Sequence, residues 1–595
     1  MMASLTMMQD TSTPNPRPLR WLLSGAFVLA ASILPTSLAI AQEAPPATQM
    51  DFGEIIDVRV KDVIVYVRDK EGNPVTGLTR EDFVLYEDGK PMPITNFYEM
   101  QSGQRTDRAD EPEMTQLERI RSNPELDPRI TSTVPESERL YLTVYIDHQN
   151  IRPQNRNRVF RDLRVFLREN LNREDRVQLL SYTRSVNVVR EWTADPALIA
   201  RALFDEAERT GGRTMVDSDR RDLINEIDEG RNSTILESRA RLFAEEQYND
   251  LRFTIDGLRE TIDNLAGVPG RKALLYVSDG LPMRAGEEMF AALLERGERG
   301  GFESGSQDLT NLRMQSFEYD ASSLFRILGS AANANGVTFY TLDAAGLLGR
   351  SMRGADMRGT GFTGSLESTW ANNMQTPLMF LADDTGGQFA VNTNNFGRVF
   401  EKMTTDFRNY YSLGYQPPHP GNGREYKIKV EIPNKRAKGV AEVRHAGSYR
   451  DKSPEQEMQE ATLAGLQYNL QNNTLGLVLR ETERIRSTDG NFVVHVDLLI
   501  PLGKVTILPR SEELHVAQLQ VWVQARDNDG GLSPTAQQEF AIPVPTADMP
   551  TIGDKYYAYS MPLQMAPGDQ RLSIGVRDRL GGQTSVVTKV FRLAS

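Results

Sequence analysis

Three short apolar runs, each ending in an aspartate, dominate the hydrophobic pattern of this chain. The runs are RLYLTVYID (139–147), ALLYVSD (273–279) and VTFYTLD (337–343). Near-continuous apolar runs separated by helical stretches are typical of parallel strands that are buried on both faces. Ligands gather at the carboxyl ends of such strands. Asp147, Asp279 and Asp343 are therefore expected to lie on one acidic rim.

Strand and helix patterns alternate between these runs and predict an α/β unit over residues 139–415. Its sheet is expected to be doubly wound and mostly parallel, with right-handed crossovers. Residues 177–182 and 186–192 predict an antiparallel pair at one edge. Residues 215–265 are strongly charged but carry apolar positions at helical spacing, which predicts a helical insertion with a solvated charged face.

Outside the α/β unit the pattern is mainly that of β-strands. Alternating apolar positions predict a small antiparallel module near the N-terminus and an antiparallel sandwich at the C-terminus. The expected segments are the small β module (52–100), a polar linker (101–138), a β annex (416–450), a helical connector (451–487) and the C-terminal β-sandwich (488–595).

The N-terminal segment 1–41 has the pattern of a secretory signal peptide. Arg17 and Arg20 precede an apolar stretch, and Ala39-Ile40-Ala41 fits a cleavage site. An exported protein, periplasmic or extracellular, with no membrane span after cleavage is expected. The alternative is a retained membrane anchor, because residues 21–40 are nearly long enough to span a bilayer.

Composition narrows the class of protein further. A length of 595 residues predicts three or four domains, and a net charge of −13 disfavours nucleic acid as a partner. The absence of cysteine excludes thiol catalysis, disulfides and cysteine metal sites. The five histidines show no spacing suited to zinc.

Several separated motifs resemble one protein family. VTGLTREDFVLYEDGK (75–90), the strand that ends at Asp147, and LLYVSDG (274–280) resemble bacterial exported proteins of the VWFA-related type, over roughly residues 52–450. The resemblance implies a von Willebrand factor A-like domain, in which helices flank a mostly parallel sheet and which serves adhesion or assembly. It also implies a metal-ion-dependent adhesion site at the top of the sheet.

That site has the family motif D-x-S-x-S, a threonine from a second loop and an aspartate after a later strand. Asp147 matches the first aspartate, Thr214 the threonine and Asp279 the last aspartate, but the serine positions hold Gln149 and Ile151. Hard cations need about six oxygen ligands. A degenerate site is therefore expected, in which Gln149 or Asn150 adds an amide carbonyl oxygen and the bound ion is Mg²⁺ or Ca²⁺. Alternatively, the aspartates only cap their turns.

The preferred hypothesis is a non-enzymatic, exported scaffold for protein interaction or adhesion. Its binding face would be the acidic rim, with the Gly- and Arg-rich loop 346–365 beside it, and its partners would be envelope or extracellular proteins. One alternative is a secreted metal-dependent hydrolase, for which His148 is the candidate base. The other is a purely structural envelope protein. The sequence leaves the oligomeric state open.

Overall fold

The computed structural model describes residues 60–106, 139–171, 174–230, 233–299, 306–347, 364–419, 421–433, 439–470, 472–488 and 490–593. The signal peptide expected over residues 1–41, most of the expected linker and most of the loop 346–365 lie outside these residues. Within the described ranges, no helix is long and apolar enough to cross a membrane.

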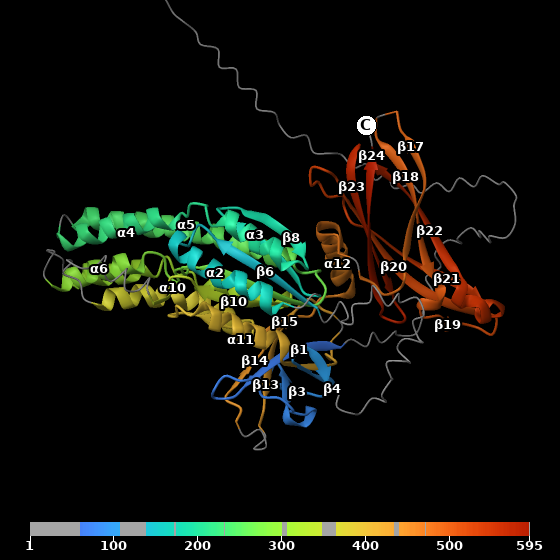
Figure 1. Cartoon of the computed structure of the whole chain (residues 1–595), viewed down its shortest axis with the longest axis horizontal. Helices are drawn as coiled ribbons and strands as arrows, with labels where there is room; N and C mark the ends of the chain where they lie inside the picture. Colours follow the sequence, from blue (N-terminus) through green and yellow to red (C-terminus); the bar gives the residue numbers. More distant parts are fainter. Residues whose placement is uncertain are drawn as a thin grey trace, which may run out of the picture.

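A six-stranded sheet forms the centre of the α/β unit (Figure 1). In spatial order its strands are β11 (Phe389–Ala390), β10 (Val337–Asp343), β9 (Arg271–Ser278), β6 (Leu140–Asp147), β7 (Arg176–Tyr182) and β8 (Val186–Thr193). All neighbours pair in parallel except β7 and β8, which are antiparallel. The predicted mostly parallel sheet with an antiparallel edge pair is confirmed.

Helices cover both faces of this sheet. One face packs against α2 (Pro153–Asn170), α3 (Pro196–Glu206) and α11 (Phe396–Arg408). The other packs against α5 (Ser233–Asn264), α8 (Ser322–Ala334) and α10 (Gly364–Asp384). All eight residues of β6 are buried, which explains why its sequence is apolar without alternation.

A helical extension stands on the carboxyl end of the sheet and has a core of its own. It consists of α4 (Arg213–Asp228), α6 (Glu287–Glu298), α7 (Ser306–Ser316) and the first halves of α5 and α10. Leu223, Phe243 and Phe290 are among its core residues. In Figure 1 these helices run away from the sheet on the left. The predicted insertion is helical, with its turn at Gly230.

The N-terminal β module is larger than the sequence suggested, because strands from distant parts of the chain complete it. One sheet has the order β14-β1-β12-β4-β5 and the other β15-β13-β2-β3. The strands are β1 (Lys61–Arg68), β2 (Val84–Glu87), β3 (Lys90–Met92), β4 (Ile94–Gln101), β5 (Gln104–Thr106), β12 (Tyr410–Tyr415), β13 (Glu425–Glu431), β14 (Glu442–Arg444) and β15 (Ser448–Arg450). The predicted division is thus corrected: β12, assigned to the α/β unit, and the separate annex 416–450 both belong to this module.

The C-terminal part is a sandwich of two antiparallel sheets, preceded by α12 (Pro454–Tyr468). Its strands are β16 (Asn472–Asn473), β17 (Val478–Arg486), β18 (Phe492–Pro501), β19 (Leu508–Pro509), β20 (Leu514–Arg526), β21 (Ala536–Pro545), β22 (Tyr556–Met565), β23 (Gly568–Asp578) and β24 (Thr584–Leu593). The helical connector predicted over residues 451–487 is only partly helical, because β17 pairs with β18. Helix α12 packs against the sandwich and also reaches the α/β unit, where Tyr468 contacts Trp192.

A buried carboxylate joins the β module to the α/β unit. Asp406 on α11 accepts hydrogen bonds from Arg68 on β1 (2.6 Å) and from Arg444 on β14 (2.8 and 2.9 Å). The side chains of Asp406 and Arg68 are 2% and 5% exposed. Removing one partner of a buried ionic group leaves the others charged and without compensation, which is strongly destabilising.

Replacing Asp406 with alanine is therefore expected to lower the free energy of unfolding by about 3–5 kcal/mol. Guanidinium-induced unfolding of the full chain, followed by circular dichroism, measures the change. Glu401→Ala is the matched control, because Glu401 is exposed on the same helix. If both substitutions lowered the free energy of unfolding by the same small amount, Asp406 would not stabilise the contact between the β module and the α/β unit.

Candidate functional site

The candidate site lies where the order of the strands reverses direction. In chain order the six strands are arranged 3-2-1-4-5-6, so the first strand, β6, lies beside the fourth, β9. The helix after β6 covers one face of the sheet and the helix before β9 covers the other. Open α/β sheets bind ligands outside the carboxyl ends of the strands at such a reversal. Asp147 ends β6 and Asp279 follows β9, so the sheet brings both aspartates to this point.

Asp147 is fully buried and its two oxygen atoms are occupied by donors from the protein. Oδ1 accepts from the peptide nitrogen of Asn150 (3.0 Å), and Oδ2 accepts from Asn150 Nδ2 (2.9 Å) and from the hydroxyl of Tyr276. Burial raises the pKa of Asp147, and the bonds from Tyr276 and Asn150 oppose this shift. Burial also raises the pKa of Tyr276 well above its ordinary value, so its hydroxyl remains a donor.

Asp279 is buried in a similar way at the neighbouring strand. Its Oδ2 accepts from the peptide nitrogen of Arg152 (3.0 Å) and from Asn155 Nδ2 (2.8 Å). Its own peptide nitrogen donates to the carbonyl oxygen of Asn150 (2.9 Å). The loop that follows β6 is therefore fastened to both aspartates.

Asp343, the third aspartate at a strand end, also accepts hydrogen bonds from the protein. Its Oδ1 accepts from the peptide nitrogen of Ala345 (3.0 Å), and its Oδ2 accepts from Gln375 Nε2 (2.7 Å). Buried carboxylates need such partners, since an unpaired charge away from water is very costly. The predicted acidic rim exists as three carboxylates at one end of the sheet, each engaged by the protein's own donors.

The other residues expected at the site lie in different surroundings. Thr214 is exposed in the first turn of α4. The side chain of Gln149 lies against Gly212, where an added Cβ would be only 2.6 Å from Oε1 of Gln149. Ile151 is fully buried in the core beneath the sheet's helices. The structure thus brings Asp147 and Asp279 together at adjacent strand ends, while Thr214 faces solvent.

This arrangement does not fit a divalent hard cation as the side chains lie. Both oxygens of Asp147 and Oδ2 of Asp279 already accept hydrogen bonds from the protein, so a cation bound through these oxygens would have to displace bonds from Asn150, Tyr276 and Asn155. The side chain of Ile151, at a position where the family motif has a serine, provides no oxygen. In the described part of the chain, no group of three or more His, Asp or Glu side chains is arranged to hold a metal ion.

Charged residues of the insertion form a buried cluster beside the rim. Asp217 pairs with Arg152 (2.6 Å) and with Arg213 (3.2 Å), and its side chain is almost completely buried. Burial alone would raise the pKa of Asp217, but the two guanidinium groups hold it below its ordinary value. Arg220 is buried over the ring of Trp370 (4.6 Å). The prediction that the charges of this insertion form a solvated face is wrong for these residues.

His148, the candidate base of a hydrolase, is fully buried. Its Nε2 lies 2.8 Å from Oε2 of Glu206, and its Nδ1 lies 3.0 Å from a guanidinium nitrogen of Arg156. Because a guanidinium can only donate, Nδ1 accepts and the proton of the neutral ring is on Nε2, directed at Glu206. The ring therefore links the loop after β6 to α2 and α3, and it is not placed to meet a substrate from solvent.

The sequence analysis missed the donors that close the site. The spacing from Asp147 to Asn150 is that of a turn in which an aspartate accepts from the backbone, and it could have been recognised. Tyr276 could not, because the pairing of β9 with β6 that places it beside Asp147 is not visible in the sequence. Asn155 and Asp217 lie on helices whose charge and polarity resemble an ordinary solvated surface.

Comparisons with known proteins give only remote likenesses. No family model matches the chain, and no curated protein matches it. Similar solved structures include an aerotolerance-related membrane protein from Bacteroides fragilis (9% identity, covering 45% of this chain and 98% of that one, TM-score 0.22). A von Willebrand factor type A protein from Catenulispora acidiphila is also similar (10% identity, covering 53% of this chain and 66% of that one, TM-score 0.21). So is a pilus adhesin from Lactobacillus rhamnosus GG (9% identity, covering 88% of this chain and 57% of that one, TM-score 0.22).

Two adjacent glycines provide a test of how tightly the loop after β6 is packed. A Cβ on Gly211 would lie 2.5 Å from the carbonyl oxygen of Ile151, whereas the three atoms nearest to a Cβ on Gly212 all belong to the movable end of the Gln149 side chain. Gly211→Ala is expected to lower the free energy of unfolding by about 1–3 kcal/mol. Gly212→Ala should have the smaller effect, and the reverse order in urea-induced unfolding would contradict this packing.

Proposed function

We propose that the chain is an exported, non-enzymatic scaffold for protein interaction, built around a VWFA-like α/β domain. In this proposal the partner is another protein of the cell envelope or the extracellular space. The compartment is supported by the pattern of residues 1–41, and the family by the motifs at 75–90 and 274–280. The net charge of −13 argues against nucleic acid as a partner.

The helical extension is the observation that carries the proposal. It is built on the carboxyl end of the sheet, the end at which VWFA-like domains are expected to bind partners, and its core is separate from the two cores that hold the sheet. The sheet is buried on both faces without it. An addition with its own core is therefore best explained as a surface for contact with another molecule.

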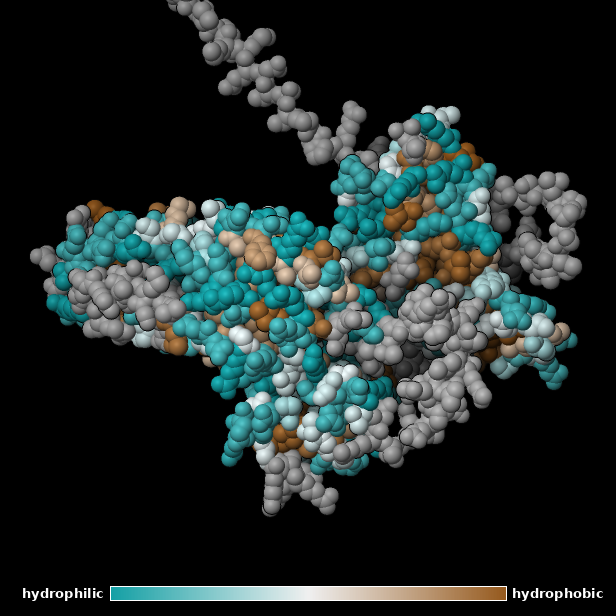
Figure 2. Space-filling model, in the orientation of Figure 1, coloured by the Kyte–Doolittle hydropathy of each residue, from teal (hydrophilic) through white to brown (hydrophobic). Residues whose placement is uncertain are grey.

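The surface of the extension has the mixed character of a reversible protein contact. Figure 2 shows it on the left as mostly hydrophilic, with isolated hydrophobic residues. Met215, Ile235 and Leu242 are 70%, 59% and 56% exposed on α4 and α5. Non-obligate protein interfaces are about as apolar as the rest of a protein surface, so this composition is compatible with a transient partner.

The closed rim favours binding over catalysis. A hydrolase would need an acid, base or nucleophile that can reach a substrate. Asp147 and Asp279 are engaged by protein donors, and His148 is buried between Glu206 and Arg156. The hydrolase alternative therefore lacks its proposed base, and the rim serves to support the helices above it.

The test is quantitative capture of envelope proteins by the mature chain, identified by mass spectrometry. Met215→Lys and Leu242→Lys place charges on the extension and are expected to reduce capture of a specific partner at least about tenfold, as loss of a contact worth 1.4 kcal/mol or more does. Val590→Lys, on the exposed side of β24 in the sandwich, is the matched control and should leave capture unchanged. Equal capture by all three variants would contradict the proposal.

A further inference from the structure

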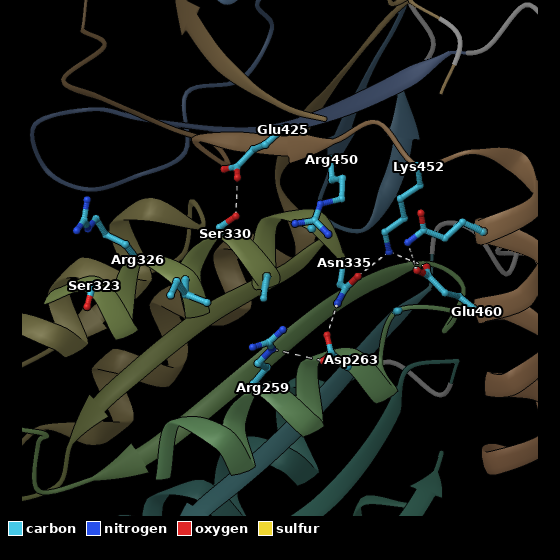
Figure 3. A pocket seen from close by; sticks show the side chains of 15 residues that line it. Arg259, Asp263, Ser323, Arg326, Ser330, Asn335, Glu425, Arg450, Lys452 and Glu460 are labelled. Atoms are coloured by element: carbon cyan, nitrogen blue, oxygen red, sulfur yellow. Dashed lines mark hydrogen bonds and ion pairs between the residues drawn. The ribbon is translucent and has the colours of Figure 1, made fainter. Parts of the chain in front are cut away.

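A large polar pocket lies at the end of the α/β unit opposite the rim. Its volume is about 830 Å³, within the range of small-molecule sites. Helices α5 and α8 form its floor near the amino ends of β9 and β10, strands β13 and β15 of the β module form one wall, and α12 closes one side (Figure 3). Three structural units therefore meet at this pocket, and ligand sites occur preferentially at such junctions.

The acidic side chains of the pocket are already engaged. Glu425 accepts from the hydroxyls of Ser330 (2.6 Å) and Ser448 (2.7 Å). Glu460 pairs with Lys452 (2.6 Å) at the inner end. Asp263 accepts from Asn335 Nδ2 (3.2 Å). Their negative charge is thus partly taken up by neighbours within the pocket.

The basic side chains are less well compensated. Arg259 is 3.8 Å from Asp263, with both side chains more than half exposed. For Arg326 and Arg450, no carboxylate of the described residues forms an ion pair with the guanidinium group. Figure 3 shows Arg450 directed from the β module towards the helices and Arg259 directed towards the pocket from α5. Two guanidinium groups from two structural units thus border the same space.

Two lysines lie at the inner end of the pocket. Lys452 lines it, and Lys272 lies behind it, donating to the carbonyl oxygens of Val268 (3.0 Å) and Ala266 (3.2 Å). Burial lowers the pKa of Lys272 to about 7, and the positive charges of Lys452 and Lys61 contribute to the shift. A negative charge bound nearby would offset this repulsion.

We propose that this pocket binds a small molecule that carries a carboxylate or phosphate group, held between the guanidinium groups of Arg259 and Arg450. Guanidinium groups bind both kinds of oxyanion through paired, charge-assisted hydrogen bonds. Arg326, which is exposed on α8, also lines the pocket and adds a third guanidinium group. The site is separate from the rim and from the helical extension, and it goes beyond the proposed function.

Binding there would also connect the three units. A ligand between Arg259 and Arg450 contacts the α/β unit and the β module at once, with α12 beside it. A ligand that binds only the folded chain stabilises it by mass action. The midpoint of thermal unfolding should therefore rise with the concentration of the bound anion.

Isothermal titration of the full mature chain at constant ionic strength tests the proposal, with citrate and inorganic phosphate as probes and glucose as the neutral control. At least one anion is expected to bind saturably, and glucose is not. Which anion binds distinguishes a carboxylate site from a phosphate site. Arg450→Gln should weaken binding at least about tenfold, because a charge-assisted hydrogen bond is lost. Arg161→Gln, exposed on α2, is the matched control and should bind like the native chain.

Two results would overturn the proposal. One is the absence of saturable heat and of any thermal shift with both anions at millimolar concentration. The other is unchanged binding in an Arg259→Gln, Arg450→Gln double variant whose circular dichroism spectrum matches that of the native chain. Both side chains are largely exposed, so the double variant is expected to fold.

Discussion

The pairing of β6 with β9 is the constraint on which the structure at the carboxyl end of the sheet depends. These strands lie side by side at the point where the strand order reverses. The aspartates at their carboxyl ends, Asp147 and Asp279, are therefore buried just beyond the sheet. A carboxylate buried there must find donors. The loop after β6, Tyr276 and the first turn of α2 supply them. The same bonds fix the loop after β6, and the start of α4 is attached to this loop because the peptide nitrogen of Gly212 donates to the carbonyl oxygen of His148 (3.0 Å).

The two ends of the α/β unit consequently differ in character. At the carboxyl end, the acids are closed off by amides, a phenol and peptide nitrogens, and helices are built over them. At the amino end, the β module and α12 leave a pocket bordered by guanidinium groups. Asp406, which holds Arg68 and Arg444, keeps the β module against the α/β unit and so maintains one wall of that pocket.

The parts of the fold that were predictable are those whose pattern is local. The runs that end at Asp147, Asp279 and Asp343 are apolar because parallel strands are buried on both faces, and the sheet follows from them. The β module was divided wrongly, since β12 and β13 pair with strands more than 300 residues away and nothing local records such pairing. Strand β17 was missed because VLRETERIR is mostly polar, and most of its residues are exposed.

The candidate site was predictable only in outline, for a similar reason. The strand-end acids follow from the pattern, but the identity of their partners depends on contacts across strands and helices. Asp217 and Arg220 resembled a solvated face because charge is usually solvated. They are buried because α4 packs against Arg152, Glu288 and Trp370, contacts that the local sequence does not record.

The central claim is that protein donors, rather than a cation, hold the strand-end carboxylates. Titration of the mature chain with Mg²⁺ and with Ca²⁺ by isothermal calorimetry tests it most directly, with an Asp147→Ala, Asp279→Ala double variant measured alongside. The account predicts no saturable heat from either ion in the native chain. Saturable heat in the native chain that disappears in the double variant would contradict it.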